Sequence, residues 1–260
     1  IMSSETGVVD LDPENILSHG RLEPGKMFLV DMDEGRIIND TEIKDNIITQ
    51  RPYKKWVNKN VLQLSDISYT GNRTPDEKIN LEVRLKIFGY TKEDFKKIII
   101  PMSVSGKESI GSMGVDTPLA VLSKKPQLVY NYFKQLFAQV TNPPLDGIRE
   151  EIVTDSSLSL GKNYNIFDII EEHSISLNIN NPIISNEDLD KIKYINHEKF
   201  ESKSIECLYE FKKGHNGIEE SLDEIVLKIE NFVDKGTNII ILSDRKVSKK
   251  MAPIPILLAC

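Results

Sequence analysis

Cysteine is scarce in this sequence, and the cysteines present have no partners at useful spacing. Of the 260 residues only Cys207 and Cys260 are cysteines, no CxxC pair occurs, and no histidine stands near either at metal-ligand spacing. The sequence therefore disfavours a disulfide framework and a zinc site, which both need several such residues at short intervals. The scarcity also points to a reducing compartment.

Long apolar runs and an excess of positive charge are lacking as well. The longest apolar runs, near Lys97–Pro101 and Asn238–Leu242, are strand-sized, whereas a membrane span needs about 18 residues. The formal net charge of −7 would repel the phosphates of nucleic acids. We therefore expect no membrane and no nucleic acid as partners. No signal-peptide pattern opens the chain, and the Ile1 start and Cys260 end lead us to expect cuts in a longer protein.

Residues 1 to 40 are rich in short β-type runs and turns. The runs are Gly7–Val9, Lys26–Asp31 and Gly35–Ile38, and Asp33-Glu34-Gly35 is good turn chemistry between the last two. That pattern predicts a hairpin. We expect a domain boundary between residues 40 and 50, where the β-rich sequence is followed by helical patterns.

Helical periodicity and capping signals recur in the rest of the chain. We predict helices over 41–49 (capped by Thr41), 92–99 (capped by Thr91), 125–140, 148–153, 186–191 (capped by Ser185) and 218–235, strands over 205–211 and 238–242, and loops over 62–84, 101–118 and 214–217. The C-terminal order of strand, helix and strand is typical of an α/β domain. The predicted fold class is α/β, with an open, mostly parallel sheet flanked by helices and preceded by a short β-rich N-terminal segment.

A glycine-rich loop at 106–114 is the first candidate site. It combines glycines with a lysine and serines, as phosphate cradles do, and Ser112 and Met113 lie in it. Its register matches neither a P-loop nor GxGxxG. Backbone amides of such a loop could bind an anion, or the loop could simply pack tightly.

The second candidate is the segment around two consecutive prolines. Pro143 and Pro144 fix the backbone, so that Thr141 and Asn142 present side chains and carbonyls at defined positions, with Arg149 following. The alternative is a helix stop held by local hydrogen bonds.

The third candidate follows the buried strand at 238–242. Ligands of open α/β sheets bind beyond the carboxyl ends of strands, where Asp244 and Arg245 stand. This pair could bind a ligand or tie two loops together. No catalytic triad, metal site or paired-carboxylate site can be assembled, so we assign no catalytic, cofactor-binding or metal residue.

Several segments resemble the large subunit of glutamate synthase. The similar stretches are SSETGVVD (3–10), GRLEPGKMFLVDMDEGRII (20–38), GSMGVDTPLAVLS (111–123), QLVYNYFKQLFAQ (127–139), FAQVTNPPLDGIREEIV (137–153), GTNIIILSDR (236–245) and APIPILLA (252–259). They run in order over nearly the whole chain. The first two resemble the closing strands of the family's class II glutaminase domain, and the others resemble its central domain.

The resemblance implies an enzyme that converts glutamine and 2-oxoglutarate into two glutamates. In the family, an N-terminal cysteine of the glutaminase releases ammonia, which a tunnel carries to an FMN-dependent synthase barrel with a 3Fe-4S cluster. The central domain links the two and binds no flavin. Because residue 1 is Ile1, we expect this chain to be that linking piece, inactive alone, with 1–45 as the glutaminase edge and linker and 46–260 as a central domain incomplete at its C-terminus.

The resemblance also implies partners and a role for the proline segment. The partners would be the glutaminase and FMN-binding synthase domains of the same chain, with an electron-donating subunit or ferredoxin. Thr141, Asn142, Pro143, Pro144 and Arg149 become candidates for the tunnel or a domain interface. We expect a cytoplasmic protein, or a plastid one in a photosynthetic eukaryote. The alternatives are a stand-alone α/β nucleotide- or phosphate-binding domain and a scaffold with interaction surfaces only.

Overall fold

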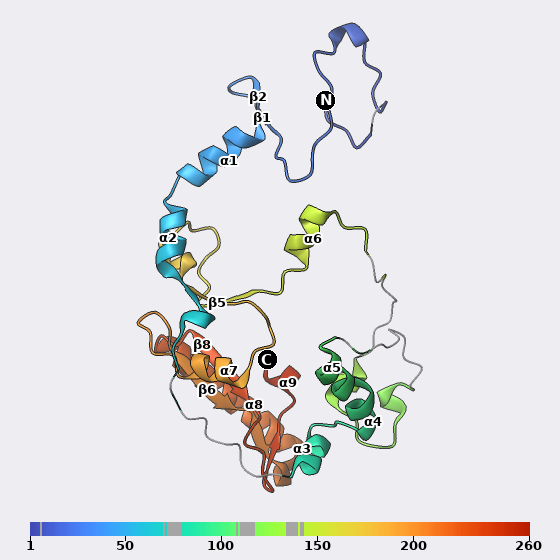
Figure 1. Ribbon diagram of the computed structural model, residues 1–260, viewed down its shortest axis with the longest axis vertical. Helices are drawn as coiled ribbons and strands as arrows, with labels where there is room; N and C mark the ends of the chain where they lie inside the picture. Colours follow the sequence, from blue (N-terminus) through green and yellow to red (C-terminus); the bar gives the residue numbers. More distant parts are fainter. Residues whose placement is uncertain are drawn as a thin grey trace. The chain divides into compact units, whose positions relative to one another are not determined.

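A computed structural model of the chain describes residues 1–5, 7–69, 71, 80–107, 109, 118–133, 140 and 143–260. Figure 1 shows these residues as coloured ribbon. The chain divides into two compact units, Ile1–Asn60 and Val61–Cys260.

The first unit contains the predicted hairpin. Strands β1 (Leu29–Asp31) and β2 (Arg36–Ile38) pair antiparallel. Asp31 Oδ1 accepts the N–H groups of Asp33 and Glu34, both at 2.9 Å, so the strand's last carboxylate holds the turn. The hairpin prediction is thus confirmed. The 3₁₀ turn η1 (Pro13–Asn15) precedes it.

Helix α1 (Asp40–Thr49) follows the hairpin, and α2 (Tyr53–Asn60) follows α1. The predicted cap of α1 is wrong. Asn39, not Thr41, accepts the N–H of Glu42 at 2.9 Å, since Asn39 is the last residue with extended backbone before the helix. The guanidinium of Arg36 donates to both carboxylate oxygens of Glu42, at 2.9 and 2.7 Å. This bidentate pair connects β2 to α1.

The predicted short strand at Gly7–Val9 is also wrong, because these residues form a turn and bends. Gly7 has φ +84°, and no described strand pairs with the run. A three-residue β-type run needs a partner strand to supply its hydrogen bonds.

The second unit mixes helices with small sheets. Its helices are α3 (Leu81–Ile87), α4 (Lys92–Asp94), α5 (Ile100–Ser105), α6 (Gly147–Val153), α7 (Asn186–Lys193), α8 (Gly214–Asp234) and α9 (Ile256–Ala259). Its strands are β3 (Val61–Gln63), β4 (Leu158–Leu160), β5 (Ser176–Ile179), β6 (Ser202–Glu206), β7 (Leu208–Glu210), β8 (Ile239–Ser243) and β9 (Met251–Pro253). This composition places the unit in the mixed α/β class.

The sheets are small and contain both pairing directions. In the described part of the chain the order β3-β5-β4 forms one sheet, with β3–β5 parallel and β4–β5 antiparallel. β6 pairs with β8 in parallel, and β7 pairs with β9 antiparallel. Of the open, mostly parallel sheet that was predicted, the described residues contain only two parallel strand pairs, each in a small sheet.

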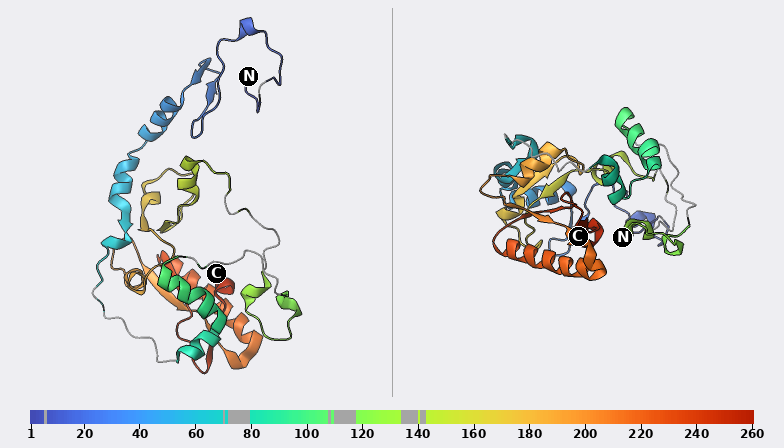
Figure 2. Two further views of the ribbon diagram at one scale, coloured as in Figure 1. Left: turned by 45° about the vertical axis from the view of Figure 1, so that its right-hand side comes forward. Right: turned by 90° about the horizontal axis from the view of Figure 1, so that it is seen from below.

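Two apolar clusters stabilise the second unit. One gathers β5, β8 and α7 around Leu177, Ile179, Ile192, Phe200 and Ile239. The other lies between α8 and the β6–β8 pair; its buried members are Ile205, Cys207, Ile225 and Ile254. Figure 2 shows α8 running along this pair of strands. Burial of such side chains contributes roughly 1.5–3 kcal/mol each.

The loop predicted for 62–84 is wrong at both described ends. β3 and the 3₁₀ turn η2 (Leu64–Asp66) occupy its start, and α3 occupies its end. β3 exists because β5, more than a hundred residues away, pairs with it. A local pattern cannot reveal such a partner.

The helix predicted to begin after Thr91 is confirmed but longer than expected. Thr91 and Asp94 form a capping box, with bonds of 3.1 and 2.8 Å. The helix continues from α4 through a π-helical turn, η3 (Phe95–Ile99), into α5. It therefore occupies 101–105, where a loop was predicted, and ends at left-handed Gly106, with φ +62°.

The helix predicted for 125–140 is wrong in its described part. Residues 125–133 contain only the 3₁₀ turn η5 (Val129–Tyr132). The side chains of Tyr132 and Phe133, expected on a buried stripe, are exposed. Without packing of its apolar face, a helix loses its main source of stability.

The C-terminal strand–helix–strand order is confirmed with two corrections. The predicted strand 205–211 is split at Cys207, whose N–H donates to Ser243 and whose C=O accepts from Ile254. The predicted loop 214–217 is the first turn of α8. Gly217 serves close packing there, since a Cβ would lie 2.8 Å from the Cβ of Lys213.

Candidate functional site

The structure places only part of the proline segment. Thr141 and Asn142 lie outside the described residues, as do Ser112 and Met113 of the glycine-rich loop. Pro143 and Pro144 are exposed and stand four and three residues before α6 (Gly147–Val153). The presence of α6 confirms the helix predicted from Ile148.

Asp146 and Arg149 set the start of α6. Asp146 Oδ1 accepts the backbone N–H of Arg149 at 2.9 Å, and Arg149 Nε lies 3.7 Å from Asp146 Oδ2. The N–H donated by Arg149 lowers the pKa of the Asp146 carboxyl below its ordinary value. Arg149 is thus held near the N-terminus of the helix while its side chain stays exposed.

One face of α6 is apolar and exposed. Ile148 and Ile152 are spaced four residues apart and are 70% and 75% exposed. Residues at this spacing share a helix face. The assignment of Pro143, Pro144 and Arg149 to a tunnel or a domain interface stays a prediction.

The loop after β8 holds the second pair of predicted residues. Arg245 Nη2 donates to Asn186 Oδ1 at 2.8 Å, and Asn186 is the first residue of α7. Arg245 therefore ties the β8 loop to α7. Asp244 is half-buried beside it. The ligand-binding role of Asp244 and Arg245 stays a prediction.

Lys246 is the next cation in this loop. Its Nζ donates to Glu206 at the end of β6. This bond raises the pKa of Lys246 above its ordinary value. The carboxyl ends of β6 and β8 thus carry two cations, Arg245 and Lys246, that each already have a hydrogen-bond partner.

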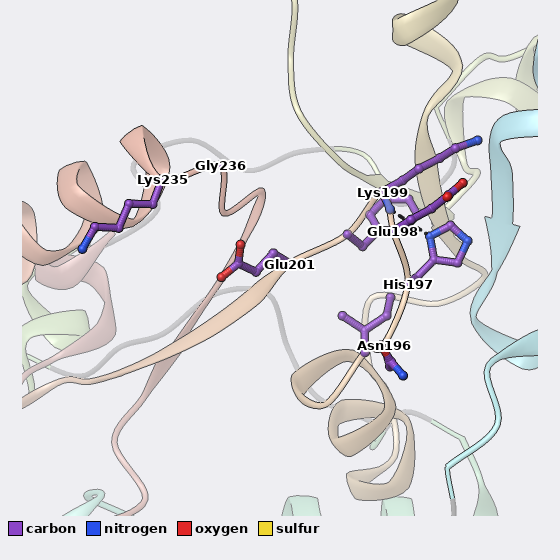
Figure 3. Close-up of a pocket in the computed structure, with 9 residues that line it drawn as sticks. Asn196, His197, Glu198, Lys199, Glu201, Lys235 and Gly236 are labelled. Atoms are coloured by element: carbon purple, nitrogen blue, oxygen red, sulfur yellow. Dashed lines mark hydrogen bonds between the residues drawn. The ribbon is translucent and has the colours of Figure 1, made fainter.

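An open pocket of about 370 Å³ lies between the loop that enters β6 and the end of α8. It is lined by Ile195, Asn196, His197, Glu198, Lys199, Phe200, Glu201, Lys235 and Gly236. Figure 3 shows His197, Glu198 and Lys199 on the entering loop, whereas Lys235 extends away from them. The N–H of Lys199 donates to His197 Nδ1 at 3.2 Å.

Asn238 joins the two backbone segments that line the pocket. Its side chain accepts the N–H of Glu201 at 2.9 Å and donates to the C=O of Lys199 at 2.7 Å. Lys235 points away from the side chains of His197, Glu198 and Lys199 (Figure 3). His197 has no cysteine or second histidine at metal-ligand spacing, and the charged residues among 197–201 were the sequence signal for a polar hollow.

The described residues contain neither a metal-binding cluster nor a membrane-spanning helix. In that part of the chain, no three His, Cys, Asp or Glu side chains are placed to share a metal ion. Nor does any helix there have the length and apolar character to cross a bilayer.

Comparison with known proteins supplies what the geometry leaves open. Residues 83–260 match the model of the glutamate synthase central domain. The chain belongs to the glutamate synthase central-domain family. Residues 1–56 match a second model, that of class-II glutamine amidotransferases.

Full-length relatives of this central-domain chain are glutamate synthases. The chain is 42% identical to the NADPH glutamate synthase large chain of Bacillus subtilis, over 100% of its own length and 17% of the relative's. It is 35% identical to the NADH glutamate synthase of Schizosaccharomyces pombe, over 100% and 13%. For the chloroplastic ferredoxin-dependent glutamate synthase of rice, Oryza sativa subsp. japonica, the values are 32%, 99% and 16%. The chain spans only 13% to 17% of the length of these relatives.

Proposed function

We propose that this chain is the central, non-catalytic linking part of a glutamate synthase. The observation that carries the proposal is the order of the two family matches, class-II amidotransferase at 1–56 and central domain at 83–260. A chain that carries part of a glutaminase domain followed by a central domain would connect the glutaminase to the synthase domain of the enzyme. We keep 1–45 and 46–260 as the proposed division.

The whole enzyme would convert glutamine and 2-oxoglutarate into two glutamates. FMN and a 3Fe-4S cluster would belong to its synthase part, and the chain itself would be inactive. Relatives named for NADPH, NADH and ferredoxin all match along almost the whole chain, so the electron donor is left open. Within the body, the parallel pairs β3–β5 and β6–β8 support an open, mostly parallel sheet.

The proline segment is the part proposed to help form the ammonia tunnel. A tunnel that carries ammonia must not protonate it, so neutral side chains and fixed carbonyls suit its wall better than charges. Thr141, Asn142, Pro143 and Pro144 have that chemistry. Arg149, the nearest cation of α6, is paired with Asp146, which favours a position beside the wall.

The test is Asn142→Ala in a full-length glutamate synthase that contains this chain. We expect glutamine-dependent glutamate formation to fall several-fold while ammonia-dependent formation is retained, because only ammonia released by the glutaminase uses the tunnel. Asn163→Ala, at an exposed position of the same domain, is the matched control. Equal losses in both reactions, or no loss, would remove the assignment.

A further inference from the structure

The two strands of the β6–β8 pair differ sharply in chemistry. β6 reads Ser-Lys-Ser-Ile-Glu and carries two charged side chains. β8 reads Ile-Ile-Ile-Leu-Ser and carries none. Edge strands are commonly protected by charges, whereas near-continuous apolar runs are typical of interior strands of parallel sheets. β6 thus has the sequence of an edge strand and β8 that of an interior strand.

Both faces of β8 are covered, as in an interior strand. Ile239 and Ile241 pack into the cluster around Leu177. Ile240 and Leu242 pack into the cluster under α8. Successive side chains of a strand point to opposite faces, so one apolar strand serves two cores at once.

One edge of β8 nevertheless has no strand beside it among the described residues. The N–H of Ile239 donates to Glu201, and the C=O of Ser243 accepts from Cys207, so the odd-numbered residues face β6. Alternation along the strand turns the N–H and C=O of Ile240 and Leu242 to the opposite edge. No strand in the part of the chain that the structure describes pairs with that edge.

The next helix shows where a following strand would go. α9 packs through Ile256 and Ala259 into the same cluster as α8, and therefore covers the same face of the β6–β8 pair. Connections between parallel strands are right-handed in nearly all cases. The connection through α8 places β8 beside β6. A second right-handed connection through α9, over the same face, would place the following strand on the far side of β8.

We propose that the outer edge of β8 receives a parallel strand from the polypeptide that follows residue 260 in a full-length glutamate synthase. The inference rests on the proposed function, which makes the chain an internal part of such an enzyme. Relatives about six times as long contain ample chain for it. The contact would extend the sheet of the linking domain through main-chain hydrogen bonds.

Hydrogen exchange of single backbone amides, read by mass spectrometry, tests this directly. The amides of Ile240 and Leu242 are compared between the 260-residue chain and the full-length enzyme. We expect exchange to be roughly 100-fold or more slower in the full-length enzyme, because the amides are then bonded and covered. The amides of Ile239 and Ile241, which face β6, are the matched controls and should be slow in both.

Each other outcome decides the matter. Fast exchange of Ile240 and Leu242 in the full-length enzyme, with slow controls, overturns the proposal. Slow exchange of both pairs already in the 260-residue chain also overturns it, because a segment of this chain or a second copy then covers the edge. If all four amides are slow only in the full-length enzyme, the outer strand holds the whole sheet, as proposed. The Asn142 experiment is unaffected by any of these results.

Discussion

Two side chains, Ser185 and Asp188, determine where α7 begins. Ser185 Oγ accepts the N–H of Asp188 at 3.1 Å and donates to Asp188 Oδ2 at 2.7 Å. Lys191 Nζ donates to the other carboxylate oxygen at 3.1 Å. The Ser185 hydroxyl, and then Lys191, lower the pKa of Asp188 below its ordinary value.

This shift predicts a pH-dependent effect of Asp188→Asn. An unfolded Asp has a pKa of about 3.9, and a lowered folded pKa stabilises the fold at neutral pH. That stability is lost as the pH falls from about 4 through the folded pKa. The variant should therefore be less stable than wild type at pH 6, and the difference should shrink as the pH approaches 2.5. Urea unfolding at a series of pH values measures it.

Ser185→Ala supplies the control for that experiment. Because the hydroxyl is the first cause of the shift, the same Asp188→Asn comparison in a Ser185→Ala background should show a smaller pH dependence. An unchanged pH dependence in that background would contradict the role given to Ser185.

At the scale of elements, the end of α8 follows a recognisable C-terminal motif. Gly236 has φ +99°. Its N–H donates to the C=O of Val233 at 2.9 Å, and that of Thr237 donates to the C=O of Phe232 at 3.0 Å. These two bonds are those of a Schellman motif, which needs a left-handed residue where Gly236 stands.

Gly236→Ala is therefore expected to lower the free energy of unfolding by about 1–2 kcal/mol, the cost of a left-handed L-residue. In the described part of the chain, no atom lies within 4 Å of the added Cβ, so the effect would come from the backbone alone. Gly147→Ala is the matched control, because its Cβ also meets open space and no positive φ is required there. Denaturant unfolding would contradict the argument if both variants lost the same stability.

These elements also show how far the sequence could be interpreted. The start of α7 and the end of α8 were predicted because the Ser185 and Gly236 signals are local. The start of α8 was missed, because Gly217 indicated a loop, whereas the glycine is there to let the helix approach Glu210, whose C=O would lie 3.1 Å from a Cβ. Propensity does not reveal such a tertiary contact.

The helix predicted for 125–140 failed for a related reason. Its periodicity describes what a helix would bury, but Phe133 is 71% exposed. For the candidate site, the position of Arg245 after a strand was predicted, whereas its bond to Asn186 joins residues 59 apart. Only the folded chain brings those two side chains together.

For the molecule as a whole, the alternative of a phosphate- or nucleotide-binding domain requires cations that are available to a ligand. Such a site would use cations beyond the carboxyl ends of the parallel strands. There, Arg245 donates to Asn186 and Lys246 donates to Glu206. A phosphate would have to displace protein partners that are already in place, which makes binding less favourable.

We therefore expect the melting temperature of the 260-residue chain to stay unchanged on addition of FMN, nucleotides or phosphate. A ligand that binds the folded state raises stability by about 2.7 kcal/mol at 100 times its dissociation constant, which a thermal shift assay detects easily. Full-length glutamate synthase freed of flavin is the positive control, since the proposed function places FMN in its synthase part. A concentration-dependent rise in the short chain would instead establish a binding site within residues 1–260, and Arg245→Ala would show whether it lies beyond β8.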